Sequence, residues 1–117
     1  MALSFAECVS ILKASLTPAE LAHGVMYVAE EAVSAGEELR FPGVVIDAAW
    51  PAHVAFVDRE PLANWAHSCR YALIHLETGE VVSHEARLPP SPADKDYQWR
   101  VAYKAEGVPD SAVLVVQ

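Results

Sequence analysis

Basic residues are scarce in this chain. Its 117 residues include 16 Asp and Glu but only 8 Lys and Arg, which gives a net charge of −8. Nucleic acids and anionic membranes are bound through clustered Lys and Arg, and no three basic residues stand in a row here. The composition therefore predicts no nucleic-acid partner and no membrane partner, and it favours at most a basic protein partner.

Cysteine and glycine are also few, and the apolar runs are short. Cys8 and Cys69 are far apart, without a CxxC pair or a Cys/His ladder, so the sequence indicates neither a disulfide framework nor a zinc ribbon. Five dispersed glycines cannot form a phosphate-binding loop, and the common catalytic motifs are absent. No apolar run approaches the roughly 20 residues of a membrane-spanning helix. We expect a cytoplasmic, non-catalytic protein without a cofactor.

What the sequence does contain is enough apolar material for one folded domain. It is 53% hydrophobic and 21% charged, far from the composition of disordered chains. We expect a single α+β domain over 1–117, in which two N-terminal helices pack on one face of an antiparallel β-sheet of four to six strands. The helical hairpin would occupy about 4–35 and the β region about 43–116.

Two patterns predict the helices. Apolar residues recur at helical spacing along 4–16. A second helix would start at the N-cap Thr17, with Pro18 at its first helical position, and end before Gly36. The sequence therefore predicts a second helix over 18–35.

The outer face of that second helix would be acidic. Glu30 and Glu31 lie on its polar side. Adjacent carboxylates point in different directions on a helix, so they are solvated charge and not a glycosidase pair. A basic partner could bind there.

Short runs of β-branched and aromatic residues, broken by Pro, Gly and Asp, predict the sheet. The expected strands are 43–48, 53–58, 68–77, 80–87, 97–104 and 111–116. Gly79 supplies the positive φ that a tight turn between the third and fourth of them needs. The last strand would leave an edge that could pair with a second copy, giving a homodimer whose cleft binds a small ligand.

Residues 71–86 read Tyr-Ala-Leu-Ile-His-Leu-Glu-Thr-Gly-Glu-Val-Val-Ser-His-Glu-Ala, an apolar strand, a Thr-Gly-Glu turn and a second apolar strand. This segment resembles the closing hairpin of PepSY-type domains. Such domains occur in peptidase propeptides and as inhibitory or ligand-binding units. In that family a helix directly precedes the hairpin, whereas this chain has Pro61 to His67 there, and we assign no family on this segment.

The same hairpin could bring a thiol and three imidazoles together. If Thr78 and Gly79 are the central residues of the turn, alternation places all four groups on one face. That face could hold a divalent metal on its histidines, or a Cys/His nucleophile pair of a hydrolase. The alternative is an ordinary solvent face. The candidate catalytic residues are Cys69, His75 and His84, and the candidate metal ligands are His67, His75 and His84.

The loop between 53–58 and 68–77 combines charged, amide, indole and imidazole groups. Trp beside Arg with a polar rim is typical of interface hot spots. We hypothesise a small acidic protein-binding module of the immunity, inhibitor or adaptor kind, although Trp65 could instead pack across the end of the sheet while Asn64 completes the turn. The candidate binding residues are Arg59, Glu60, Asn64, Trp65 and His67, together with Glu30 and Glu31.

Overall fold

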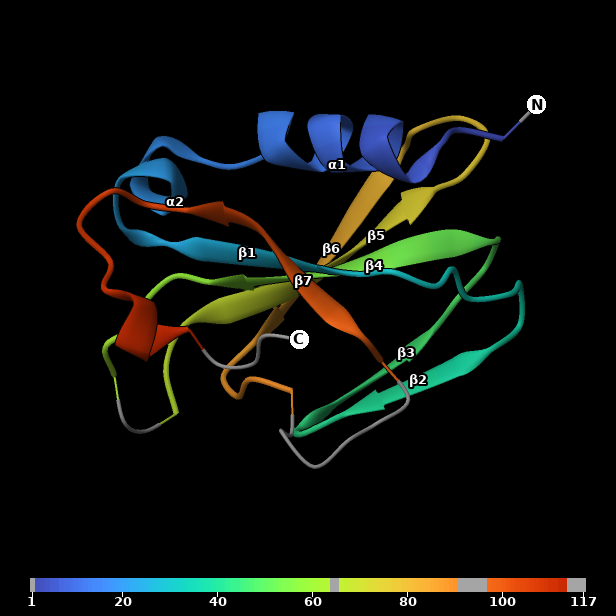
Figure 1. Cartoon of the computed structure of the whole chain (residues 1–117). Helices are drawn as coiled ribbons and strands as arrows, with labels where there is room; N and C mark the ends of the chain where they lie inside the picture. Colours follow the sequence, from blue (N-terminus) through green and yellow to red (C-terminus); the bar gives the residue numbers. More distant parts are fainter. Residues whose placement is uncertain (1, 64–65, 91–96, 114–117) are drawn as a thin grey trace.

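A five-stranded antiparallel sheet forms the centre of the computed structural model (Figure 1). The structure describes residues 2–63, 66–90 and 97–113. The strand order is β6-β5-β4-β1-β7, and a separate two-stranded sheet pairs β2 with β3. The strands are β1 (Val25–Ala29), β2 (Glu38–Phe41), β3 (Val44–Asp47), β4 (Ala52–Asp58), β5 (Cys69–His75), β6 (Val81–Ala86) and β7 (Trp99–Lys104). With two helices before this sheet, the predicted α+β class is confirmed.

Both helices begin at a capping box, because Ser4 exchanges hydrogen bonds with Glu7 and Thr17 does so with Glu20. The helices are α1 (Phe5–Ala14) and α2 (Pro18–His23), and a 3₁₀ turn, η1 (Asp110–Ala112), follows β7. The prediction of a helix at 4–16 is confirmed by α1. None of the helices in the described part of the chain has the length and apolarity that crossing a membrane requires.

Each face of the sheet has its own apolar core. On one face α1 buries Cys8 and Leu12 against alternate residues of β1, β4 and β5. On the other face the β2–β3 hairpin packs Phe41 and Ile46 over Tyr71 and its neighbours. Figure 1 shows α1 and the β2–β3 hairpin on opposite sides of the sheet. Because both faces are covered, β1, β4 and β5 are buried along nearly their whole length.

The prediction of one helix over 18–35 is wrong. The helix ends at His23, and the chain continues through Gly24 into β1, which lies between β4 and β7. A Cβ on Gly24 would lie 2.8 Å from the Glu20 carbonyl oxygen and 2.9 Å from the Asp58 carbonyl oxygen. Glycine therefore allows the backbones of α2 and β4 to approach closely at this turn. The helical hairpin over 4–35 does not form.

Five of the six predicted strands are confirmed in place, with ends that differ by one or two residues. They are the strands observed as β3, β4, β5, β6 and β7. The strand expected at 111–116 is wrong at its start, because residues 110–112 form η1 instead, and its residues 114–116 lie outside the described residues. Strands β1 and β2 were not predicted.

Candidate functional site

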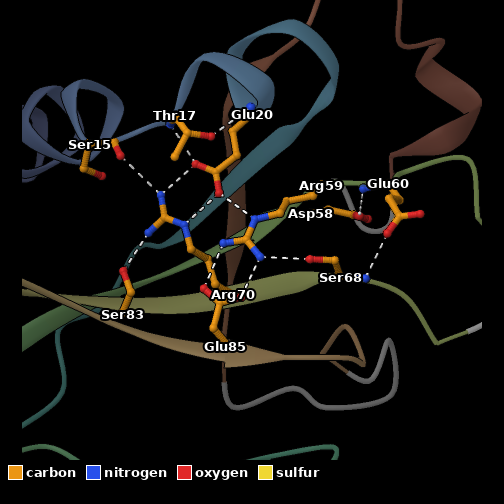
Figure 2. Close-up of polar contacts among 10 residues, drawn as sticks. All are labelled: Ser15, Thr17, Glu20, Asp58, Arg59, Glu60, Ser68, Arg70, Ser83 and Glu85. Atoms are coloured by element: carbon orange, nitrogen blue, oxygen red, sulfur yellow. Dashed lines mark hydrogen bonds and ion pairs between the residues drawn. The ribbon is translucent and has the colours of Figure 1, made fainter.

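Four charged side chains, two of them buried, gather at one end of the sheet, where α2 meets the ends of β4, β5 and β6 (Figure 2). We call this group the arginine cluster; its members are Glu20, Arg59, Arg70 and Glu85. The Glu20 side chain is inaccessible to solvent. Its carboxylate accepts hydrogen bonds from Arg59 Nε at 2.8 Å, and from Arg70 Nε at 2.9 Å and Nη2 at 3.0 Å. A single buried carboxylate thus joins two guanidinium groups.

Local structure explains how these groups meet. The capping box turns Glu20 back toward the backbone N–H of Thr17, which donates to it at 2.9 Å. Arg70 is on the same face of β5 as Ala72 and Ile74, the face that α1 and α2 cover. Burial alone would raise the pKa of Glu20, but the hydrogen bonds from Arg70, Thr17 and Arg59 outweigh it and lower the pKa to about 2. The carboxylate is therefore ionised at neutral pH.

The two arginines extend this cluster to β6 and to the end of the following loop. Arg59 binds Glu85 through two hydrogen bonds, of 2.6 Å from Nη1 and 2.9 Å from Nη2. Arg59 Nη1 also donates to Ser68 Oγ at 2.9 Å, while Arg70 Nη1 donates to Ser83 Oγ at 2.7 Å. Bidentate pairs of this kind are geometrically specific. Both ends of the loop 59–68 are thus held against the sheet.

A second buried pair lies at the same end of the sheet, on the face that the β2–β3 hairpin covers. Asp58 Oδ1 accepts hydrogen bonds from His67 Nε2 at 2.8 Å and from the Glu60 backbone N–H at 3.0 Å. Asp58 Oδ2 is buried and has no hydrogen-bond partner among the described residues. Burial raises the pKa of Asp58, and the bonds from Glu60 and His67 oppose that rise. The pair ties the loop 59–68 to the last residue of β4.

Cys69 is opposite Asp58 in the β4–β5 pairing and is fully buried. Its Sγ donates to the carbonyl oxygen of Leu88 at 3.6 Å. Burial, and then the nearby Asp58 carboxylate, raises the pKa of the Cys69 thiol to about 11. A catalytic thiol must be accessible and ionised, so the environment of Cys69 opposes the role of nucleophile.

We expect Cys69 to resist alkylation in the folded protein. A pKa of about 11, against a usual value of 9.0, lowers the thiolate fraction at pH 8 about a hundredfold, and burial slows the reaction further. Iodoacetamide labelling followed by peptide mass spectrometry, with and without urea, measures this protection. Labelling of Cys69 at equal rates in the two conditions would contradict it.

The three histidines do not form the predicted cluster. The backbone N–H of His75 donates to the Glu80 carbonyl oxygen, and His84 pairs with Tyr71 instead of Leu73. The β5–β6 register therefore differs by two residues from the expected one. The turn between the strands is a four-residue loop, 76–79, and is not centred on Thr78 and Gly79 alone. His75 stacks on Trp50 with ring centroids 4.6 Å apart. With His67 at Asp58, no group of three or more His, Cys, Asp or Glu side chains within 2–63, 66–90 and 97–113 could hold a metal.

The candidate binding residues separate into two regions. Glu30 follows β1 and forms an ion pair with Arg100 of β7, and Glu31 is exposed in the next turn, so the expected acidic helix face does not exist. Arg59, Glu60 and His67 all belong to the contacts described above. The remaining two, Asn64 and Trp65, lie outside the described residues.

Three of the four members of the arginine cluster, Glu20, Arg70 and Glu85, were not among the site residues predicted from the sequence. Glu20 and Arg70 are 50 positions apart. One signal was present, since Arg70 occupies a position of β5 where alternation with Ala72 and Ile74 calls for an apolar residue. A charge at such a position requires a buried partner of opposite sign.

A shallow hollow of about 200 Å³ lies beside the arginine cluster. It is formed by the end of α2, the start of the loop 59–68 and the turn after β7. We call it the loop surface; the residues that define it are Ala22, His23, Arg59, Pro61, Leu62 and Val108. Leu62 is 69% exposed at its rim. The surface is therefore apolar at its rim and fixed at its base by Arg59.

No protein-family model matches the chain, and comparison with curated proteins and with solved structures finds no match either. The functional argument therefore rests on the contacts within the arginine cluster and the loop surface.

Proposed function

We propose that the chain is a non-catalytic protein-binding module, of the immunity, inhibitor or adaptor kind, that contacts its partner through the loop surface. The observation that carries this proposal is Leu62. Its exposed fraction of 69% is the largest among the large apolar side chains of the described residues. An apolar side chain at the rim of a hollow is the type of group that interfaces bury at their centre.

The rigid base of the loop supports the same proposal. Arg59 is bonded to Glu20, Glu85 and Ser68 at once, and Asp58 holds His67 at the other end. A surface that is already ordered loses less conformational entropy when a partner binds. These polar groups serve to shape the loop and are not available as catalysts, which favours binding over hydrolysis.

The charge of the chain favours a basic partner. Its net charge is −8, and Glu60 and Glu106 are exposed on the two segments that border the loop surface. Such a field accelerates encounter with a positively charged protein and suppresses encounter with an acidic one. The two cysteines are buried and unpaired, which agrees with the reducing cytoplasm that we propose as the location.

We expect Leu62→Asp to weaken partner binding strongly. A carboxylate at the rim would have to be desolvated on association, and it removes the apolar contact as well. The measurement is capture from native lysate with the immobilised domain, quantified by mass spectrometry. A protein retained by the wild type should be reduced at least about tenfold with Leu62→Asp, the loss expected for a central contact residue.

Val45→Asp is the matched control for this substitution. Val45 is 54% exposed on β3, in the two-stranded sheet away from the loop surface. The same charge placed there should leave capture unchanged. Equal capture by all three proteins would contradict the proposed surface, and so would equal loss with both variants.

A further inference from the structure

A second hollow lies against the first turns of α1. Its volume is about 410 Å³, against about 200 Å³ for the hollow at the loop surface. We call it the α1 hollow; it is lined by Leu3, Ala6, Glu7, Ser10 and Ile11. Leu3 and Ile11 pack partly against the core below α1, while Ala6 and Ser10 are exposed. The α1 hollow is therefore mainly apolar and open to solvent.

The turn between β5 and β6 borders this hollow. The backbone N–H of Leu3 donates to the Leu76 carbonyl oxygen at 2.6 Å. A Cβ on Gly79 would lie 3.1 Å from Ile11 Cδ1 and 3.6 Å from Leu3 Cδ1. Figure 1 shows the turn beside the N-terminal end of α1. Since the turn follows the end of β5 and the loop surface precedes its start, the two hollows lie at opposite ends of that strand.

The charges around the α1 hollow have one sign. Glu7 is one of its lining residues, and Glu77 and Glu80 are exposed at the bordering turn. Neither 2–12 nor 72–86 contains Lys or Arg. A partner that covers this surface must therefore bring positive charge to offset the carboxylates. Nucleic acids and anionic membranes carry the wrong charge for it.

The shape of the hollow follows the helix. Ala6 and Ser10 are four residues apart, so they lie on one face of α1, one turn from each other. Rows at this spacing are the ones that most often interdigitate when two helices pack, and small side chains allow a close approach. An extended segment would lay unpaired N–H and C=O groups over the apolar side chains, whereas a helix pairs its own.

We propose that the α1 hollow binds a basic amphipathic helix of another protein, which lies along α1 with its apolar face in the hollow and with Lys or Arg on either side. A second copy of the chain does not supply such a helix from its described residues. Its α1 has one basic residue, Lys13, and its α2 contains neither Lys nor Arg. Occupation of the α1 hollow leaves the loop surface free, so the chain can hold two proteins at once.

The probe for this site is a synthetic helical peptide with Leu along one face and Lys on both sides of it. We expect titration calorimetry to give a dissociation constant below about 1 mM that rises with salt. The same peptide with Glu in place of Lys should not bind. With ¹⁵N-labelled protein, the amides that shift should be those of α1 and of the turn at 76–80. Absence of binding, equal binding of both peptides, or shifts confined to the loop surface would overturn the proposal.

Ala6→Arg tests whether the peptide occupies the hollow itself. The new side chain fills the hollow and adds a like charge, so the dissociation constant should rise at least about tenfold. Arginine is a good helix former, and Ala6 is exposed, so α1 should remain folded. Val45→Arg adds the same charge on β3, across the sheet from α1, and should leave the dissociation constant unchanged. Equal effects of the two substitutions would contradict the site.

A second pair of variants tests the acidic border. Glu77→Gln combined with Glu80→Gln should weaken peptide binding severalfold, as expected for exposed charges. Glu38→Gln combined with Glu106→Gln removes the same net charge from β2 and from the turn after β7, and should have no effect. Equal losses in the two double variants would show attraction to the net charge alone and would overturn the proposal. Leu62→Asp should not affect peptide binding, so this result and the loop-surface result can fail separately.

Discussion

Replacing Glu20 with Gln is expected to lower the free energy of unfolding by about 3–5 kcal/mol, the usual result of removing one member of a buried ion pair. The neutral amide would leave Arg70, whose side chain is 6% exposed, without its counter-charge. Arg59 would retain Glu85, which lies at the surface and is 70% exposed. Urea unfolding followed by circular dichroism measures the loss.

Glu7→Gln is the matched control for this experiment. Glu7 occupies the same capping-box position in α1 that Glu20 occupies in α2, but it is exposed, and its carboxylate accepts a hydrogen bond from the Ser4 backbone N–H instead of from buried arginines. Gln is accepted at that position of a capping box, so Glu7→Gln should change stability little. Similar losses in the two variants would show that capping, and not the arginine cluster, makes Glu20 important.

Glu20→Gln should also change how the free energy of unfolding depends on pH. The folded pKa of Glu20 is about 2, below its ordinary value of 4.5. Because this pKa is depressed, ionised Glu20 stabilises the folded state when the pH is above 4.5, and that stabilisation is lost as the pH falls from 4.5 toward 2. The pH dependence from Asp58 has the opposite sign. Its pKa is raised in the folded state, so its contribution to stability is lost as the pH rises through that folded pKa. Acid unfolding of Glu20→Gln should therefore be less steep between pH 4.5 and 2.

The error at residues 25–29 shows where sequence patterns lose their meaning. The segment Val-Met-Tyr-Val-Ala lies in the middle of the sheet and is buried on both faces. A short apolar run of this kind has no distinctive period, so it can be read as either a helix or a strand. Because Thr17 is a strong helix-start signal, the predicted helix was continued through this segment. Gly24, where α2 and β4 meet, was the local signal of the break.

The candidate site was predictable only in part, for a related reason. Arg59, Glu60 and His67 lie close together in sequence, and the composition of their loop was interpreted as that of an interface. Glu20 reaches the same site from far along the chain, and no local pattern specifies such a contact. The histidine face depended on one assumed turn, and a change of two residues in the register moved His84 from Leu73 to Tyr71.

The cover on the second face of the sheet is a third feature that alternation did not reveal. Cys69, Tyr71 and Leu73 were interpreted as belonging to one face of β5 that could be open to solvent. They are buried because β2 and β3 pack over them. Alternation shows which residues of a strand share a face, but it does not show whether that face is covered. Here the cover is the β2–β3 hairpin, which comes from a distant part of the chain.

Phe41→Ala is expected to destabilise the protein by about 3–5 kcal/mol, because truncating a buried phenylalanine leaves a cavity. Phe41 is 5% exposed and stacks on Tyr71, with ring centroids 4.2 Å apart and planes 11° apart. It also contacts Trp99, at 6.2 Å between ring centroids. Its loss removes the main aromatic contact between the β2–β3 hairpin and the sheet. Urea unfolding measures the total effect, and hydrogen exchange shows where it acts.

The distribution of exchange distinguishes two ways in which the hairpin can be held. With Phe41→Ala, the amides of β2 and β3 should lose protection well before those of β4 and β5, because the central strands keep the α1 core on their other face. Val45→Ala, on the same hairpin but 54% exposed, should change neither stability nor exchange. If Phe41→Ala instead raised exchange equally in β3 and β4, the hairpin and the sheet would unfold as one cooperative unit, and the aromatic stack would stabilise the whole fold and not only its second layer.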